Sequence, residues 1–332
     1  MTALLDVQNL SLVFRSTGGG AIPALQDVSF TLDRGETLAV LGESGSGKSI
    51  TAKAIMGILP QPAARITGGS ILFDGQDLLT LPAAKLRKVQ GARISMVFQD
   101  ALSALNPVQT VATQIAELYR VHQRMPKKQA HAAAVDMMRA VRIPDAVNRA
   151  NDYPFQFSGG MRQRIMIAMA LALDPDILIA DEPTTALDAT VQAQILELLA
   201  EITQERSMAL LMITHDLGVA GQLADRALVM YAGRVAEQGP VGSLFDAPAH
   251  PYTKGLLGSI PSAAHRGGDL PTIPGLPPDI ANRPVGCSFH PRCPYATAIC
   301  RTTLPILDEF SSGRAAACHH TKEVIADAAV GA

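Results

Sequence analysis

A short apolar stretch, Thr37–Leu41, leads directly into the glycine-rich segment Gly42–Ser49 (GESGSGKS). Residues 50–59 then show helical periodicity, which stops at Pro60. The segment matches G-x-x-x-x-G-K-[ST] and lies between a strand and a helix, as that motif requires. In this setting glycines let backbone N–H groups turn inward, and the helix N-terminus adds its positive end. The feature therefore predicts an α/β domain with a phosphate cradle.

Each residue type in the cradle has an expected task. Lys48 supplies a point charge to the phosphates, and the Ser49 hydroxyl suits Mg²⁺. The residues expected to contact the phosphate ligand are Gly42, Glu43, Ser44, Gly45, Ser46, Gly47, Lys48, Ser49 and Ile50.

A second apolar strand, Ile177–Ala180, ends in two carboxylates, Asp181 and Glu182. In open α/β sheets ligands bind at the carboxyl ends of the strands. Asp181 suits the Mg²⁺ shell, and Glu182 is placed to orient and polarise an attacking water. The two segments together predict phosphate chemistry rather than phosphate binding alone.

Further strands are expected at residues 4–13, 28–32, 93–98 and 209–214, and helices at 192–205 and over most of 106–151. Buried strands that alternate with helices indicate a mostly parallel sheet covered on both faces.

Composition excludes several classes of protein. Apolar residues make up 48% of the 332 residues, which is too many for a disordered chain. Aromatic residues are only 4%, there is no Trp and the net charge is -2, so no nucleic-acid partner is expected. No apolar run is long enough to span a bilayer, and residues 1–8 do not resemble a signal peptide. We expect a soluble intracellular protein.

The last 72 residues differ from the rest of the chain. They contain 9 of the 22 prolines, a density that predicts mostly loop. We therefore place a boundary near Pro261, with one domain over residues 1–260 and an extension over 261–332.

The segment Ser158–Gln163 (SGGMRQ) lies 23 residues before Asp181 and resembles the ABC signature sequence. The chain thus resembles the nucleotide-binding subunit of an ABC transporter. Gln99 matches the Q-loop of that family, Ala186–Asp188 the D-loop and His215 the switch histidine, all in the family's order.

Longer motifs resemble the oligopeptide/dipeptide importer ATPases, and the cysteine-bearing tail points to the dipeptide-type D subunit. These motifs are Phe98–Asp100, Leu105–Pro107, Gln156–Arg164, Asp181–Asp188 and His250–Thr253. The sequence departs from the family at Ala101, where Pro is usual, and at Phe155, where His is frequent. No aromatic residue stands at the usual adenine-stacking place, where Ile22 is found, and Phe14 is the other candidate.

The resemblance implies an α/β fold of the P-loop NTPase (RecA-like) type with an antiparallel β subdomain and a helical subdomain at about 99–157. It implies ATP hydrolysis with Mg²⁺ held through Ser49, Gln99 and Asp181, and catalytic roles for Glu182, His215 and Gln99. The signature residues Ser158, Gly159, Gly160 and Met161 would contact the nucleotide of an opposing subunit.

Partners follow from the same resemblance. It implies two transmembrane permease subunits, a second related ATPase in a heterodimer, and a solute-binding protein outside the cell. The chain would lie peripherally on the cytoplasmic face of the membrane and drive import of di- or oligopeptides or similar small solutes. A soluble ABC ATPase of DNA repair or translation is the alternative. The single ATPase unit and the importer-like tail that begins at His250 argue against it.

All four cysteines, Cys287, Cys293, Cys300 and Cys318, fall within the tail. In a reducing cytosol such clustering points first to metal. The absence of close C-x₂₋₄-C pairs disfavours structural zinc, and the resemblance to dipeptide-type subunits implies a [4Fe–4S] cluster. Two alternatives stay open: zinc, with a histidine joining from His290, His319 or His320, and reduced thiols without a ligand.

Overall fold

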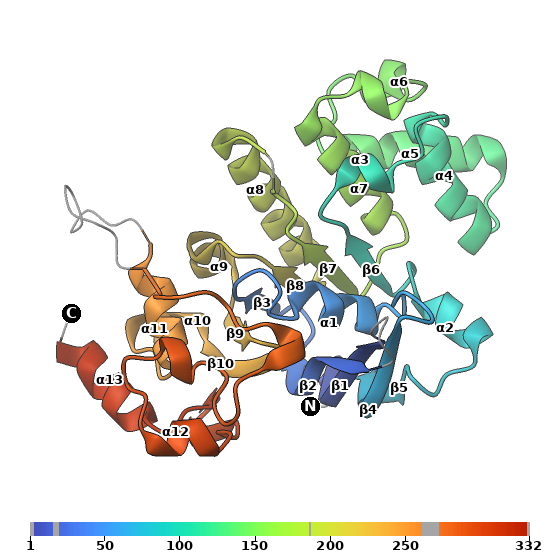
Figure 1. Cartoon of the computed structure of the whole chain (residues 1–332). Helices are drawn as coiled ribbons and strands as arrows, with labels where there is room; N and C mark the ends of the chain where they lie inside the picture. Colours follow the sequence, from blue (N-terminus) through green and yellow to red (C-terminus); the bar gives the residue numbers. More distant parts are fainter. Residues whose placement is uncertain (1–2, 16–19, 186, 261–271, 331–332) are drawn as a thin grey trace. The chain divides into compact units, whose positions relative to one another are not determined.

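The computed structural model describes residues 3–15, 20–185, 187–260 and 272–330 (Figure 1). It divides into two compact units. Unit 1 contains residues 1–33, 37–79 and 213–332, and unit 2 contains residues 34–36 and 80–212. The expected boundary at Pro261 lies outside the described residues.

The first sheet of unit 1 is antiparallel, with the order β2-β1-β4-β5. Apolar side chains recur along β1, where Leu5, Val7, Leu10 and Leu12 are all buried, as expected for a strand with one covered face. The strands are β1 (Leu5–Arg15), β2 (Ala21–Leu32), β4 (Ala64–Phe73) and β5 (Gln76–Asp77). This is the antiparallel β subdomain that the resemblance implies.

The second set of strands in unit 1 has the order β11-β12-β10-β9-β3. β3 pairs with β9 in parallel, and β9, β10, β12 and β11 pair antiparallel in turn. The bounds are β3 (Thr37–Leu41), β9 (Arg226–Tyr231), β10 (Arg234–Pro240), β11 (Asp308–Ser311) and β12 (Arg314–Ala316). All five residues of β3 are buried, which agrees with the apolar run Leu38–Leu41 after Thr37.

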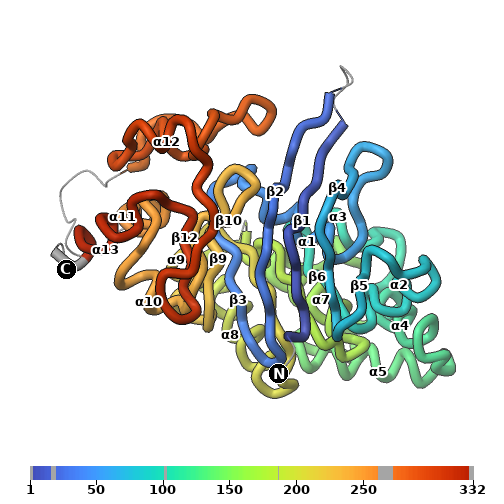
Figure 2. Tube along the Cα trace, turned by 90° about the horizontal axis from the view of Figure 1, so that it is seen from below, coloured from blue at the N-terminus to red at the C-terminus, as the bar shows by residue number. Residues whose placement is uncertain are grey.

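The extension contains more regular structure than its prolines predict. Strands β11 and β12 form a hairpin whose turn contains Gly313 at φ 70°, and β12 pairs with β10 (Figure 2). The expectation of mostly loop is wrong for residues 308–330, because the prolines lie at 305 and before. The helices of unit 1 are α1 (Lys48–Ile55), α9 (Leu217–Leu223), α10 (Val241–Asp246), α11 (Pro251–Gly258), η3 (Ile280–Asn282), η4 (His290–Arg292), α12 (Ala298–Thr302) and α13 (Thr321–Val330).

Unit 2 has the strand order β8-β7-β6 and is otherwise helical. The strands are β6 (Ile94–Val97), β7 (Ile177–Asp181) and β8 (Ala209–Ile213), whose last residue falls in unit 1. The helices are α2 (Ala83–Val89), α3 (Ala101–Ala104), α4 (Val111–His122), α5 (Lys127–Ala140), α6 (Ala146–Arg149), η1 (Pro154–Gln156), α7 (Gly159–Leu171) and α8 (Ala189–Arg206). Within the described ranges, none of the helices has the length and apolarity that crossing a bilayer requires.

Candidate functional site

The glycine-rich loop of unit 1 has a shape that only glycine permits at two points. Gly42 has φ 144°, and a Cβ there would lie 2.3 Å from the carbonyl oxygen of Met230. Gly47 has φ 109° and stands directly before α1, where a Cβ would lie 2.8 Å from Leu25 Cδ2. The sequence therefore dictates a tight loop between buried β3 and the first turn of α1.

Lys48 is buried within this loop, with 6% of its surface exposed. Its Nζ donates to the carbonyl oxygens of Gly42, at 2.7 Å, and Glu43, at 3.0 Å. The Ser46 hydroxyl is also buried, and it makes no hydrogen bond within the described part of the chain. Since a buried hydroxyl without a partner is costly, Ser46 Oγ fits a site meant for phosphate oxygens.

The other expected loop residues differ in exposure. Ser44 and Gly45 are exposed at the tip of the loop, and Ser49 and Ile50 are half-buried in the first turn of α1. Glu43 is held twice from outside the loop: Arg292 binds its carboxylate, and its N–H donates to the Tyr252 hydroxyl at 2.8 Å. Nothing in the sequence indicated these two contacts, which join residues 249 and 209 positions apart.

His215 lies in unit 1 near the end of β3. The preceding N–H, of Thr214, donates to the carbonyl oxygen of Val40 at 3.2 Å. The following residue, Asp216, caps α9 by accepting from the N–H groups of Gly218 and Val219. The neighbours on both sides therefore fix the backbone of exposed His215, which lies two residues after β8.

In unit 2, Gln99 and Glu182, both expected to be catalytic, lie within hydrogen-bond distance of each other. Strands β6 and β7 are parallel, with Val97 paired to Ala180, so both residues follow the carboxyl ends of neighbouring strands. Gln99 Nε2 donates to Glu182 Oε2 at 2.9 Å. Asp181 is the buried last residue of β7.

The Glu182 carboxylate is held in place. Its backbone has φ 47°, which is uncommon for a residue other than glycine and costs conformational energy. The Thr185 hydroxyl donates to Glu182 Oε2 at 2.8 Å, beside the bond from Gln99. A strained backbone with an oriented carboxylate is typical of a catalytic position.

The segment Ser158–Met161 opens α7 in unit 2. Ser158 Oγ accepts from the Met161 N–H at 3.4 Å and caps the helix, and Ser158 and Gly159 are exposed. A Cβ on Gly160 would lie 2.4 Å from Val191 Cγ1, so glycine lets α7 pack on α8. Asp188 of the expected D-loop caps α8 through the Val191 N–H, and Ala186 lies outside the described residues.

Ser49 belongs to unit 1, whereas Gln99 and Asp181 belong to unit 2. All three side chains offer hard oxygen donors, the ligand type that Mg²⁺ prefers. Ser49, Gln99 and Asp181 therefore have the side-chain oxygens that a Mg²⁺ ion requires.

The four cysteine side chains line one small cavity in unit 1, together with His290, His319 and His320. Burial raises the pKa of Cys293 to about 11 and that of Cys318 to about 12. Among the residues described, however, no three Cys, His, Asp or Glu side chains are grouped so that they could hold a metal ion. The chain gathers the thiols around one space without forming a ready metal site.

The adenine contact has two candidates on neighbouring strands. Phe14 of β1 and Ile22 of β2 are cross-strand partners, and both are half-buried. Ser16–Gly19 of the same stretch lie outside the described residues.

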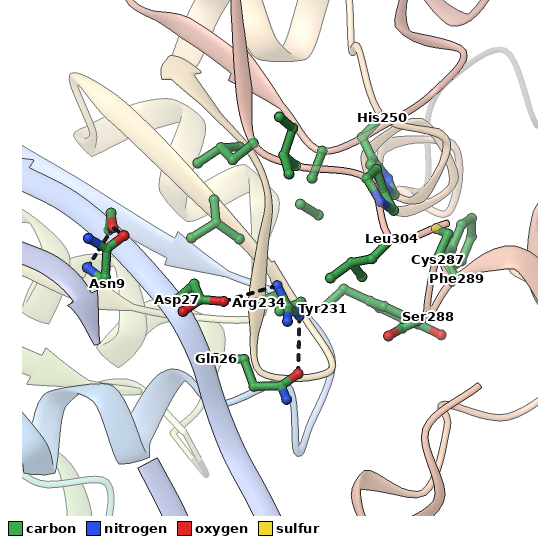
Figure 3. Close-up of a pocket in the computed structure, with 17 residues that line it drawn as sticks. Asn9, Gln26, Asp27, Tyr231, Arg234, His250, Cys287, Ser288, Phe289 and Leu304 are labelled. Atoms are coloured by element: carbon green, nitrogen blue, oxygen red, sulfur yellow. Dashed lines mark hydrogen bonds and ion pairs between the residues drawn. The ribbon is translucent and has the colours of Figure 1, made fainter. Parts of the chain in front are cut away.

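A larger cavity of unit 1 lies between the antiparallel sheet, the β9–β10 hairpin and the extension (Figure 3). Arg234 on its wall bonds to Gln26 Oε1 and pairs with Asp27. Tyr231 and Phe289 line it from other sides, and no residue of the glycine-rich loop does. This cavity is therefore separate from the phosphate cradle.

Comparisons with known proteins agree with this geometry. The family model described as "ABC transporter" matches residues 25–185, and the model described as "Oligopeptide/dipeptide transporter, C-terminal region" matches residues 236–300. The dipeptide transport ATP-binding protein DppD of Bacillus subtilis is 52% identical over 305 residues, which are 92% of this chain and 91% of DppD. The chain belongs to the oligopeptide/dipeptide ABC transporter family of ATP-binding proteins.

Other members are equally similar. The oligopeptide transport ATP-binding protein OppD of Salmonella typhimurium is 50% identical over 315 residues, covering 95% of this chain and 93% of OppD. Among solved structures, the ATP-binding cassette MJ0796, a dimer bound to ADP and Pi, aligns with a TM-score of 0.64 and 28% identity. The alignment covers 71% of this chain and 98% of that one.

The structure of cbiO1 from Clostridium perfringens, part of an ABC transporter complex, has a TM-score of 0.62 at 28% identity, over 74% of this chain and 91% of its own. The family and the ABC cassette fold, both predicted from the sequence, are confirmed. A soluble ABC ATPase of DNA repair or translation finds no support among these relatives.

Proposed function

We propose that this ABC ATP-binding protein hydrolyses ATP to drive the import of di- or oligopeptides or similar small solutes. The observation that carries the proposal is the oriented Glu182 carboxylate, held by Gln99 and Thr185 at the ends of two parallel strands. The Lys48 loop of unit 1 supplies the phosphate cradle that this chemistry needs. The names of relatives at about half identity give the solute class.

Glu182 accepts a hydrogen bond from the attacking water and polarises it toward the γ-phosphate. Gln99 keeps that carboxylate in place, and His215 contacts the γ-phosphate so that water and carboxylate stay in register. Ser49, Gln99 and Asp181 would hold Mg²⁺, which would neutralise negative charge on the phosphates. Lys48 adds the nearest side-chain cation.

The nucleotide site is shared between two subunits. Ser158, Gly159, Gly160 and Met161 open α7 with N–H groups at a helix N-terminus, which suits an anion brought by an opposing subunit. The dimeric cassette bound to ADP and Pi supports this arrangement. We assign the opposing subunit to a second, related ATPase.

A simple dilution series tests the shared site. The isolated chain should release phosphate slowly, and the related ATPase should raise the rate per chain. A diluted monomer as fast as the complete complex would exclude a shared site.

Helical residues 99–157 present a surface to two transmembrane permeases. Apolar side chains are exposed there: Phe155 is 69% exposed, Val147 54% and Val108 79%. Tyr153 and Phe155 stack with their ring centroids 5.8 Å apart, which gives this surface a rigid aromatic element. Such groups fit a membrane-bound partner on the cytoplasmic face, with a solute-binding protein on the other side of the membrane.

We keep the division into an ATP-binding domain over residues 1–260 and an extension over 261–332. The oligopeptide/dipeptide C-terminal family model over residues 236–300 supports a tail specific to these importers.

For the cysteines we propose a [4Fe–4S] cluster held by Cys287, Cys293, Cys300 and Cys318. The four thiols line one cavity. Burial raises the pKa of Cys287, Cys293 and Cys318, so a bound cation is needed to keep these three as thiolates. Zinc with one of the histidines, and reduced thiols, are the competing states.

Iron, sulfide and zinc are measured in anaerobically purified wild type and Cys293→Ser. About four irons per chain, lost in the variant, are expected. One zinc without iron would assign the site to zinc, and no metal in either protein would leave reduced thiols.

The test of function is transport in membrane vesicles. This chain is co-expressed with two transmembrane permease subunits of a dipeptide importer, and ATP-dependent uptake of labelled di- and tripeptides is measured with the solute-binding protein. We expect the chain to sediment with the permeases and uptake to require ATP. A chain that stays in the supernatant while the permeases are present would contradict the proposal.

A further inference from the structure

The phosphate-binding loop is held from outside by the cysteine-bearing extension. Arg292 Nη1 donates to Glu43 Oε2 at 2.7 Å, and Arg292 Nη2 donates to Glu43 Oε1 at 3.0 Å. This is a two-point pair in which the Arg292 side chain is 5% exposed and the Glu43 side chain 25%. Bidentate arginine–carboxylate pairs fix direction as well as charge.

The extension holds the guanidinium rigidly. Arg292 Nε donates to the carbonyl oxygen of Pro274 at 3.0 Å, and Nη1 lies 3.4 Å from the Tyr231 hydroxyl. Its carbon lies 5.9 Å from the ring centroids of both Tyr231 and Phe289, whose positions Figure 3 shows. These contacts fix the direction in which the guanidinium faces Glu43.

Lys48 holds the loop from inside, because its Nζ bonds to the carbonyl oxygens of Gly42 and Glu43. Tyr252, outside the loop, accepts from the N–H of Glu43. Arg292 therefore acts on the segment that Lys48 also holds. Without Arg292 a carboxylate would stand unpaired in the loop that receives a polyphosphate, and like charges would oppose binding.

We propose that Arg292 is a positioning residue for nucleotide binding: it fixes the start of the phosphate-binding loop and neutralises Glu43. This rests on the proposed function, since it assumes that the loop binds MgATP. Arg292 acts through Glu43 and has no contact with the nucleotide in this account.

A double-mutant cycle separates charge from packing. MgATP affinity is measured by calorimetry on the full-length wild type, Arg292→Gln, Glu43→Gln and the double variant. Arg292→Gln should bind about tenfold more weakly, and the double variant should recover to within about threefold of wild type, because no carboxylate is left unpaired. A purely structural role of Arg292 would leave the double variant as weak as the single one.

Three controls fix the interpretation. Arg301→Gln removes an exposed arginine of the same extension and should keep wild-type affinity. If Arg292→Gln does not fold, Arg292→Lys keeps the charge but loses the two-point geometry, and should bind more than about twofold more weakly than wild type but more tightly than Lys48→Ala. Lys48→Ala should bind MgATP more weakly because it removes the loop's own cation.

Two outcomes overturn the inference. One is Arg292→Gln or Arg292→Lys binding within twofold of wild type while Lys48→Ala fails. The other is a double variant that does not recover. Lys48→Ala binding as tightly as wild type would instead overturn the proposed function.

Discussion

The phosphate-binding loop, residues 42–49, and the extension, residues 272–330, lie in the same unit but are built in different ways. The loop is set by its own consecutive residues: glycines with positive φ at 42 and 47, and a lysine bonded to its own loop. The extension is set by contacts between distant residues, such as the pairing of β12 with β10 and of Arg292 with Glu43. A local motif can therefore be predicted from the sequence. The distant residues that hold the motif in place cannot.

The comparison also separates two kinds of energetic contribution. The loop contributes N–H groups and one cation to the nucleotide directly. The extension contributes by holding the loop through Arg292, which binds the Glu43 side chain. Tyr252 of α11 holds the loop's backbone at the Glu43 N–H. Changes in the loop should therefore cost more affinity than changes in the residues that hold it.

The largest loss of MgATP affinity is expected when Lys48, the cation of the loop, is replaced. Lys48→Ala should weaken MgATP binding about a hundredfold, because the phosphates lose their nearest side-chain charge. Direct titration of the full-length chain measures it, with Lys53→Ala in α1 as the control that changes charge outside the loop. If Lys48→Ala binds MgATP as tightly as wild type, the loop does not bind the nucleotide, and the contrast between loop and extension does not hold.

A second effect tests local packing in unit 2. Gly160→Ala places a Cβ 2.4 Å from Val191 Cγ1, and the clash should lower the free energy of unfolding by about 1–3 kcal/mol. Gly159→Ala is the matched control, because its Cβ would meet Leu187 Cδ2 at an ordinary 3.7 Å. Denaturant unfolding of both variants gives the measurement. Equal stability of the two would mean that Gly160 is not needed for the α7–α8 contact.

The smallest effect is expected at the hydrogen bond between the Tyr252 hydroxyl and the backbone N–H of Glu43. Tyr252→Phe removes one hydroxyl from a buried contact with the Glu43 N–H, and a single hydrogen bond is worth about 1 kcal/mol. MgATP affinity should fall about fivefold or less. Tyr295→Phe is the control, since its hydroxyl bonds to Lys254 and Asp327 instead. A Tyr252→Phe variant weaker than Lys48→Ala would reverse the order of importance proposed here.

Much of the fold was predictable because its signals are local. Strand β3 was predicted with its exact bounds, and β7 and α8 were predicted with small errors at their ends. Strands β4, β9 and β10 were not predicted. The alternation is broken at Gly68-Gly69 in β4. In β9 five of the six residues are buried, and its other neighbour besides β10 is β3, far away in sequence.

The candidate site divides in the same way. Gln99 and Glu182 were each predicted as site residues, because each follows an apolar strand and Gln99 matches the family's Q-loop, but the hydrogen bond between them was not predicted. Arg292 and Tyr252 were missed, because an arginine beside a cysteine and a tyrosine after a proline carry no sign of the loop they contact. The cysteines were recognised as a group, but their spacing does not determine how closely the sulfurs approach one another.

The central claim is that this chain hydrolyses ATP with Glu182 as the group that activates water. Its most direct test is steady-state phosphate release by the assembled transporter containing Glu182→Gln, with MgATP affinity measured on the same preparation. The account predicts a loss of turnover of at least about a hundredfold with affinity unchanged, because the amide keeps the shape of the side chain and loses its basicity. Turnover within about threefold of wild type would contradict the account.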